Sequence, residues 1–125
     1  MKSTTTVNDF GSFLNDNNDV TLILKAVRDL AEHMGHSLEN PISLNLVCLN
    51  LGISEQIACD ISVEIYKTFL SQNEQIDYST MKKIMHDLLP ESKNFSDISI
   101  RAVLKGIAKS LYPEIEPYIL TTRQS

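Results

Sequence analysis

Tryptophan is absent from the 125-residue sequence, which has only four tyrosines and four phenylalanines. The apolar residues, 42 % of the chain, are dominated by leucine and isoleucine, and this balance favours helix packing over a β-sandwich. No stretch approaches the ~20 uncharged apolar residues of a transmembrane helix. The N-terminal sequence also lacks an apolar core long enough for a signal peptide, so we expect a cytoplasmic protein.

Cysteine is scarce as well, with only Cys48 and Cys59 present. Both fall in stretches that we expect to be helical. A disulfide between them is possible in principle, but buried free thiols are favoured, because cytosolic thiols stay reduced and cysteine behaves as a small hydrophobic residue.

Residues suited to catalysis or metal binding are few. His33 and His36 are separated by Gly35, where we expect a helix to end, so "EHMGH" does not form a pair of zinc ligands on one helix. His86 has no neighbouring nucleophile. The sequence has no glycine-rich phosphate loop, serine elbow or cysteine pair at metal spacing, and "DFG" at residues 9–11 lacks every other kinase element. We therefore expect no enzyme, no cofactor and no metal.

Negative charge is concentrated in the first half of the chain. The net charge is −5, and all of this excess lies in residues 1–60, because acidic and basic residues balance in residues 61–125. A general affinity for nucleic acid is therefore not expected. Any surface that attracts phosphate should lie in the second half and depend on a local cluster of basic residues.

Apolar residues recur at helical spacing in five segments. The first runs from Val20, after an Asp19 cap, to a stop at Gly35. The others are expected at 41–51 (Asn40 cap, Pro41 in the first helical position), at 54–70, from 77 or 79 to 89, and at 97–111 after a Ser96 cap, with a short helix or turn at 114–120. The sequence thus predicts an all-α fold, a compact bundle of five to six short helices. A polar mobile arm at 1–18 precedes a single helical domain at 19–120, and a short tail follows at 121–125.

A helix-turn-helix-like corner is predicted at residues 41–70. Cys48 occupies the small position of the first helix, and "LGIS" around Gly52 matches the turn. Ala58 stands where a β-branched residue is usual, which departs from the pattern. Ser54 and Gln56 are the candidate contacts to DNA, yet the carboxylates nearby oppose docking to a polyanion. An ordinary helical corner of the core remains the alternative.

The fifth segment carries a basic stripe, defined here as Arg101, Lys105 and Lys109, at intervals of four residues on one side of a helix. Lys93 in the preceding loop and Lys82 and Lys83 on the fourth segment could extend it. These six residues are candidate contacts to phosphate or to an acidic partner, and the alternative is a plain solvated face.

The apolar side of the same segment holds Ile100, Val103, Leu104, Ile107 and Leu111. Gly106 lies inside it and lowers helix propensity by ~1 kcal/mol relative to alanine. A glycine at this position predicts close contact with another helix.

Residues 42–89, "ISLNLVCLNLGISEQIACDISVEIYKTFLSQNEQIDYSTMKKIMHDLL", resemble the helical part of an ATP-cone, the nucleotide-sensing module of ribonucleotide reductases and their repressors. That family begins with a small β element that carries a Lys-Arg-Asp-Gly-type nucleotide contact. This chain offers only "KAVRDL" there, within a helical segment, so the nucleotide-binding residues are not carried over.

The stretch "VNDFGSFLNDNNDVTLILKAVRDLAEHMG", together with the chain length and residue usage, resembles the small third protein of multi-gene transposons from Gram-positive bacteria. The resemblance implies an accessory protein that modulates transposition together with larger recombinases. Protein partners and weak or indirect DNA contact are then expected, without a membrane. A stand-alone helix-turn-helix regulator and a nucleotide-sensing module remain the alternative functions.

Overall fold

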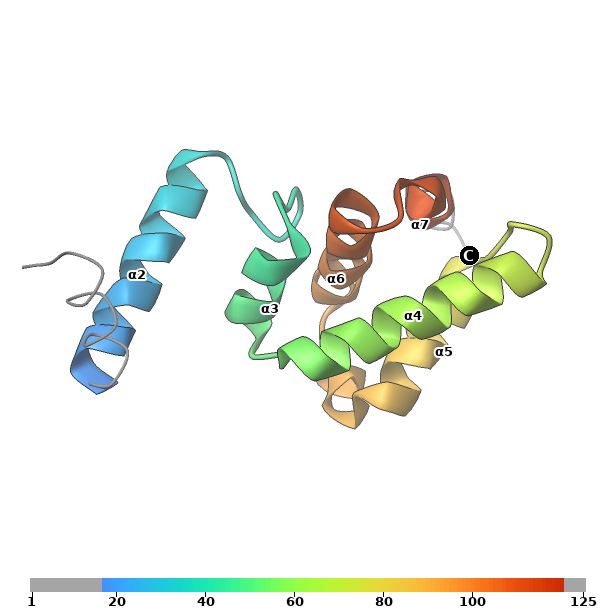
Figure 1. Cartoon of the computed structure of the whole chain (residues 1–125), viewed down its shortest axis with the longest axis horizontal. Helices are drawn as coiled ribbons and strands as arrows, with labels where there is room; N and C mark the ends of the chain where they lie inside the picture. Colours follow the sequence, from blue (N-terminus) through green and yellow to red (C-terminus); the bar gives the residue numbers. More distant parts are fainter. Residues whose placement is uncertain (1–16, 121–125) are drawn as a thin grey trace, which may run out of the picture. The chain divides into compact units, whose positions relative to one another are not determined.

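The computed structural model describes residues 17–120, which contain six α-helices and two short 3-10 helices and no strand (Figure 1). The all-α prediction is therefore confirmed. The chain forms two compact units that divide between Met34 and Gly35, and the predicted single domain, 19–120, spans both. Nearly all of the predicted arm (1–18) and the whole of the predicted tail (121–125) lie outside the described residues.

The unit before Gly35 contains helix α2, Asn17–His33. The predicted end is correct, and Gly35 follows with a φ of +97°, in the region that favours glycine. The predicted start is wrong by about three residues, because Asp19 lies in the first turn and is not the cap. A carboxylate there still stabilises the helix through the helix dipole. The "KAVRDL" stretch lies inside α2, so it forms no β element.

In the unit from Gly35 on, helix α3 spans Leu44–Leu51. The predicted start with an Asn40 cap and Pro41 is wrong: Ser43 is the N-cap, and its hydroxyl accepts a hydrogen bond from the Leu46 amide at 3.3 Å. The helix starts later than predicted because tertiary contacts of His36 hold the preceding residues in a loop. Nδ1 of the buried His36 accepts a hydrogen bond from the Ile42 amide at 3.1 Å. The ring hydrogen is therefore on Nε2, which donates a hydrogen bond to Asn50 Oδ1 at 2.9 Å.

The three longer helices of this unit begin where the sequence predicts, and of the two positions left open for the second of them, Asp77 and not Ser79 is the N-cap. Ser54, Asp77 and Ser96 each accept a hydrogen bond from a backbone amide three residues later, which satisfies one of the free donors of the first turn. The elements from here to the end are α4 (Glu55–Ser71), α5 (Tyr78–Leu88), the 3-10 helix η1 (Pro90–Asn94), α6 (Asp97–Ser110), the 3-10 helix η2 (Pro113–Ile115) and α7 (Glu116–Leu120).

The core of this unit lies where α3 packs against α6, α4 against α5, and α6 against α7 (Figure 1). Its fully buried side chains include Val47, Ile61, Ile65, Met81, Met85, Ile100, Leu104, Ile107, Ile115 and Ile119. Leu111, which was expected on the apolar side of α6, is 48 % exposed. The reason is that α6 ends at Ser110, so Leu111 is the C-cap residue and leaves the buried face.

Gly106 confirms the close helix contact predicted for it. A Cβ atom at this position would lie 2.8 Å from the Leu44 Cα and 3.2 Å from the Leu44 backbone nitrogen. Since both are backbone atoms, they cannot rotate away. Glycine therefore allows the first turn of α3 to pack directly on the backbone of α6.

Candidate functional site

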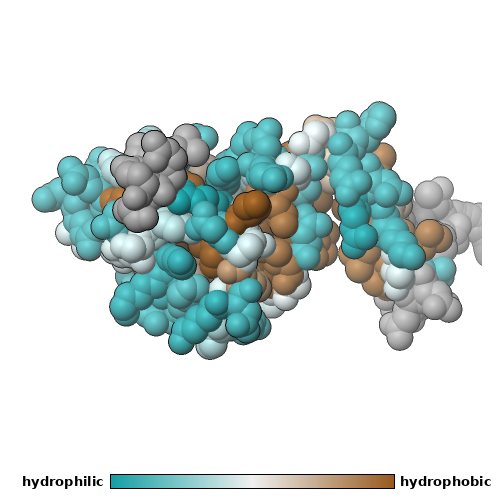
Figure 2. All heavy atoms as spheres, turned by 180° about the vertical axis from the view of Figure 1, so that it is seen from behind, coloured by the Kyte–Doolittle hydropathy of each residue, from teal (hydrophilic) through white to brown (hydrophobic). Residues whose placement is uncertain are grey.

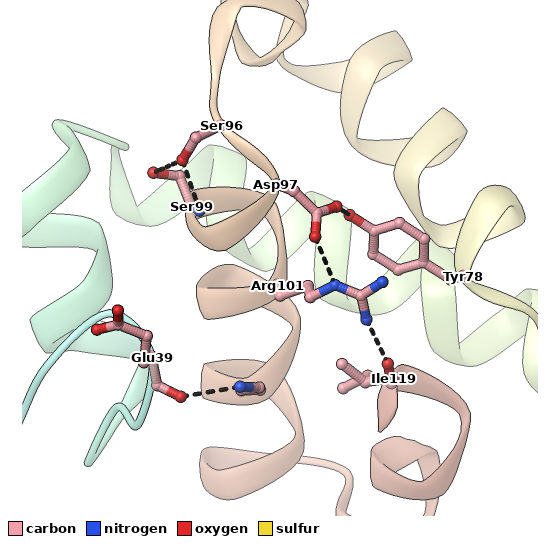
Figure 3. Close-up of polar contacts among 8 residues, drawn as sticks. Glu39, Tyr78, Ser96, Asp97, Ser99, Arg101 and Ile119 are labelled. Atoms are coloured by element: carbon pink, nitrogen blue, oxygen red, sulfur yellow. Dashed lines mark hydrogen bonds and ion pairs between the residues drawn. The ribbon is translucent and has the colours of Figure 1, made fainter. Parts of the chain in front are cut away.

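Arg101 on α6 is engaged within the fold (Figure 3). Its guanidinium carbon lies 4.0 Å from the centre of the Tyr78 ring on α5, a stacked arrangement that arginine favours. Its Nε donates to Asp97 Oδ2 at 2.8 Å and its Nη1 donates to the Ile119 carbonyl oxygen at 2.6 Å. The side chain is only 17 % exposed. Arg101 thus joins α5, α6 and α7 and offers little of its guanidinium group to a phosphate.

The same cluster perturbs two ionisable groups. The Tyr78 hydroxyl donates to Asp97 Oδ1 at 2.5 Å (Figure 3). This hydrogen bond, and then the one from Arg101, lowers the pKa of the Asp97 carboxyl. Burial, and then the hydrogen bond to Asp97, raises the pKa of the Tyr78 phenol. The cluster therefore favours Asp97 as the charged carboxylate and Tyr78 as the neutral phenol.

The rest of the basic stripe differs from Arg101. The half-buried Lys105 donates from Nζ to the carbonyl oxygen of Glu39 at 2.8 Å, a contact drawn in Figure 3. Lys109 is exposed. The stripe is therefore divided, since two of its three cations bind the protein's own backbone and one faces solvent.

The residues that were expected to extend the stripe lie on α5 and η1. Lys82 is half-buried, and its Nζ lies 6.0 Å from the centre of the Tyr78 ring, so Lys82 and Arg101 meet around one aromatic side chain. Lys83 is exposed and forms an ion pair with Asp87 at 3.4 Å. Lys93 is exposed on η1. Lys83 keeps 77 % of its side chain exposed despite this ion pair, so it can, like the exposed Lys93 and Lys109, still reach an external contact.

The turn of the helix-turn-helix-like corner has the predicted local geometry. Gly52 ends α3 in the left-handed conformation, with a φ of +72°, and Cys48 is buried at the small position. The two candidate DNA contacts are otherwise engaged. Ser54 caps α4 by accepting from the Ile57 amide at 3.2 Å, and Gln56 donates from Nε2 to Asp60 Oδ1 at 2.9 Å. The start of α4 thus presents an acidic, internally hydrogen-bonded surface.

An apolar groove lies beside this turn and was not predicted. We name it the corner groove; its volume is about 750 Å³. It lies between α3, the first turns of α4 and the end of α6, and its lining is mostly apolar, comprising Leu44, Asn45, Cys48, Leu49, Ile53, Glu55, Ala58, Cys59, Ser110 and Leu111. Figure 2 shows brown, apolar atoms among hydrophilic ones at the surface of the unit that begins at Gly35. One feature of the sequence pointed to an exposed apolar surface here. The helix "LNLVCLNL" is too uniformly apolar to bury all of its apolar side chains on one face.

One histidine and one serine outside these regions lie close together, in a buried position. His86 Nδ1 and the Ser92 hydroxyl are hydrogen-bonded at 2.7 Å, but Ser92 is fully buried and cannot meet a substrate. Within residues 17–120, no group of three or more histidine, cysteine, aspartate or glutamate side chains is arranged to hold a metal ion. In the same range, no helix has both the length and the apolar character needed to cross a membrane.

Comparison with protein-family models, with curated proteins and with solved structures found no match to this chain.

Proposed function

We propose that the protein is a non-enzymatic accessory or regulatory protein in a DNA transaction and that it acts mainly by contact with larger proteins. One observation carries the proposal. Where a helix-turn-helix protein would present cations to DNA, this chain presents the exposed Glu55, which lines an apolar groove, and the exposed Asp60 on the same helix. Carboxylates repel phosphate, whereas an open apolar surface favours contact with another protein.

The DNA part of the proposal depends on the sequence. The resemblance to the small third protein of multi-gene transposons implies a role in transposition or recombination, with a larger recombinase as the partner. Direct DNA contact is then weak and involves three exposed lysines of the predicted basic cluster, Lys83, Lys93 and Lys109.

A charge-reversal experiment tests this arrangement. Fluorescence anisotropy of a labelled duplex should show binding at low salt that disappears at moderate salt, as expected for a few phosphate contacts. Changing Lys83, Lys93 and Lys109 together to glutamate should abolish that binding without unfolding the domain. Arg101 is not suitable for this test, because its replacement would also remove the contacts with Tyr78 and Ile119.

The protein contact is tested in the cells that normally make the protein. A tagged copy should purify together with DNA-recombining or DNA-regulating proteins after nuclease treatment. Duplex binding that survives moderate salt without any partner, or copurification that depends entirely on DNA, would refute the proposal.

A stand-alone helix-turn-helix regulator is the second candidate. The observation in its favour is the turn itself, because Gly52 and the Ser54 cap reproduce the geometry that such a motif needs. It predicts sequence-selective duplex binding that Gln56→Ala weakens. Equal affinity for a random duplex would exclude it.

A further inference from the structure

The corner groove is open to solvent and is bounded by two half-exposed leucines. Leu49 on α3 is 53 % exposed, and Leu111 after α6 is 48 % exposed. They come from different elements, so both α3 and the end of α6 contribute exposed apolar surface to the groove.

We propose that the corner groove binds a basic amphipathic helix of a partner protein, whose apolar side chains enter the groove while a lysine or arginine meets Glu55. This inference deepens the proposed function and depends on it, since it names the surface through which the protein contacts its partner.

The walls of the groove are held in place before any partner binds. At Gly106 the backbones of α3 and α6 are in direct contact, and the Leu44 amide donates to the Ser110 hydroxyl at 3.0 Å. Both Leu44 and Ser110 line the groove. A site that is already formed needs little ordering when it binds, so more of the contact energy appears as affinity.

The shape favours a helix over other occupants. A small ligand is normally enclosed by its pocket, whereas here the leucines at the edge are about half exposed. Addition of a strand needs a free sheet edge, and residues 17–120 contain no strand. A groove between helices instead accepts the side chains that an amphipathic helix presents at intervals of three and four residues.

The charge of the groove selects a basic partner. Glu55 is the one charged side chain in the lining, and within the described residues no cation lies at ion-pair distance from its carboxylate. Asp60 is also exposed on α4 but does not line the groove. Lys109 is exposed next to Ser110 in the sequence but does not line the groove. A cation on the partner would therefore find a carboxylate, and an acidic partner would be repelled.

Model peptides provide the test with the full-length protein. The probes are a helical leucine/lysine peptide, a leucine/glutamate peptide with the same leucine positions, and an alanine/lysine peptide without the apolar face. Binding is measured by titration calorimetry and located by the rate at which the exposed Cys59 in the groove is alkylated. We expect the leucine/lysine peptide to bind and to slow alkylation of Cys59. The other two peptides should bind at least about tenfold more weakly, which corresponds to about 1.4 kcal/mol.

Matched variants separate the groove from the rest of the surface. Leu49→Ser should weaken binding about tenfold, whereas Leu70→Ser, at a leucine of similar exposure (49 %) in the last turn of α4, should not. Glu55→Lys should weaken binding in the same way, and Glu91→Lys, on the exposed side of η1, should not. Leu111→Ser is the second apolar test, in case Leu49→Ser loses its cooperative unfolding transition.

Several outcomes would overturn the inference: no binding of the leucine/lysine peptide, equal binding of the three peptides, or equal losses in the matched controls. These failures are distinct from failure of the proposed function. If the peptides do not bind but Leu49→Ser still purifies with its cellular partners, only the groove assignment is wrong. If no DNA-related protein copurifies with the natural sequence, the proposed function is wrong whatever the peptides do.

Discussion

Replacement of Gly106 by alanine sets helix propensity against packing. In an isolated helix the change would stabilise by ~1 kcal/mol. Here the new Cβ would lie 2.8 Å from the Leu44 Cα, and overpacking of this kind costs roughly 1–3 kcal/mol. Separation of α3 from α6 would also weaken the hydrogen bond from the Leu44 amide to the Ser110 hydroxyl. This loss destabilises the protein by about 1 kcal/mol more. The gain offsets one of these costs, so we expect Gly106→Ala to destabilise the protein by about 1–3 kcal/mol.

Urea unfolding followed by far-ultraviolet circular dichroism measures this change. The midpoint should fall while the slope m stays constant, and the melting temperature should decrease by on the order of 5–20 °C. Lys109→Ala is the control, because Lys109 is an exposed residue on the same helix and its replacement should stay within about 0.5 kcal/mol. A Gly106→Ala protein as stable as the natural one, or more stable, would refute the close contact between α3 and α6.

Three further predictions follow from the contacts around Arg101 and from the two thiols. Arg101→Lys should lower the free energy of unfolding by about 1–2 kcal/mol in urea titrations, because lysine cannot stack flat on Tyr78 while keeping both hydrogen bonds; an unchanged midpoint would contradict this. The hydrogen bond from the Tyr78 hydroxyl, and then the one from Arg101, lower the pKa of the Asp97 carboxyl. The ionised carboxylate therefore stabilises the fold at pH values above its ordinary pKa of about 3.9. This stabilisation is lost as the pH falls through the lowered pKa. Melting temperatures measured between about pH 2 and 6 should therefore depend less on pH in Asp97→Asn, and identical curves would rule the linkage out. Mass spectrometry should find that a maleimide modifies the exposed Cys59 in the native protein much faster than Cys48, which is only 9 % exposed and whose pKa is raised by burial. Equal rates for the two thiols would exclude the packing described here.

Local signals in the sequence were enough to place most of the helices. Ser54, Asp77 and Ser96 are caps whose hydrogen bonds close within three residues, so no distant contact is needed to recognise them. The start of α3 is different. Asn40 and Pro41 form a strong local signal, yet His36 binds both the Ile42 amide and the Asn50 side chain. These contacts hold the chain outside a helix until Ser43, and a local pattern does not contain them.

The same distinction applies to the candidate site. Spacing by four residues correctly places Arg101, Lys105 and Lys109 along α6, but it does not tell whether each cation is free. The partners of Arg101 include Tyr78 on α5 and Ile119 on α7, and the partner of Lys105 is a carbonyl group 66 residues earlier. Because these partners come from distant parts of the sequence, their contacts could not be predicted from the stripe itself.

The separation between partners along the chain also has a consequence for folding. Leu44 and Ser110 are hydrogen-bonded across 66 residues, as are Lys105 and Glu39. Contacts between such distant residues require closure of a long loop, which slows folding. On the ribosome, α3 is made early but cannot dock until α6 has emerged, and protein synthesis adds only ≈ 5–20 residues per second. Each new molecule therefore spends on the order of seconds with the apolar α3 uncovered, a period during which a chaperone can bind it.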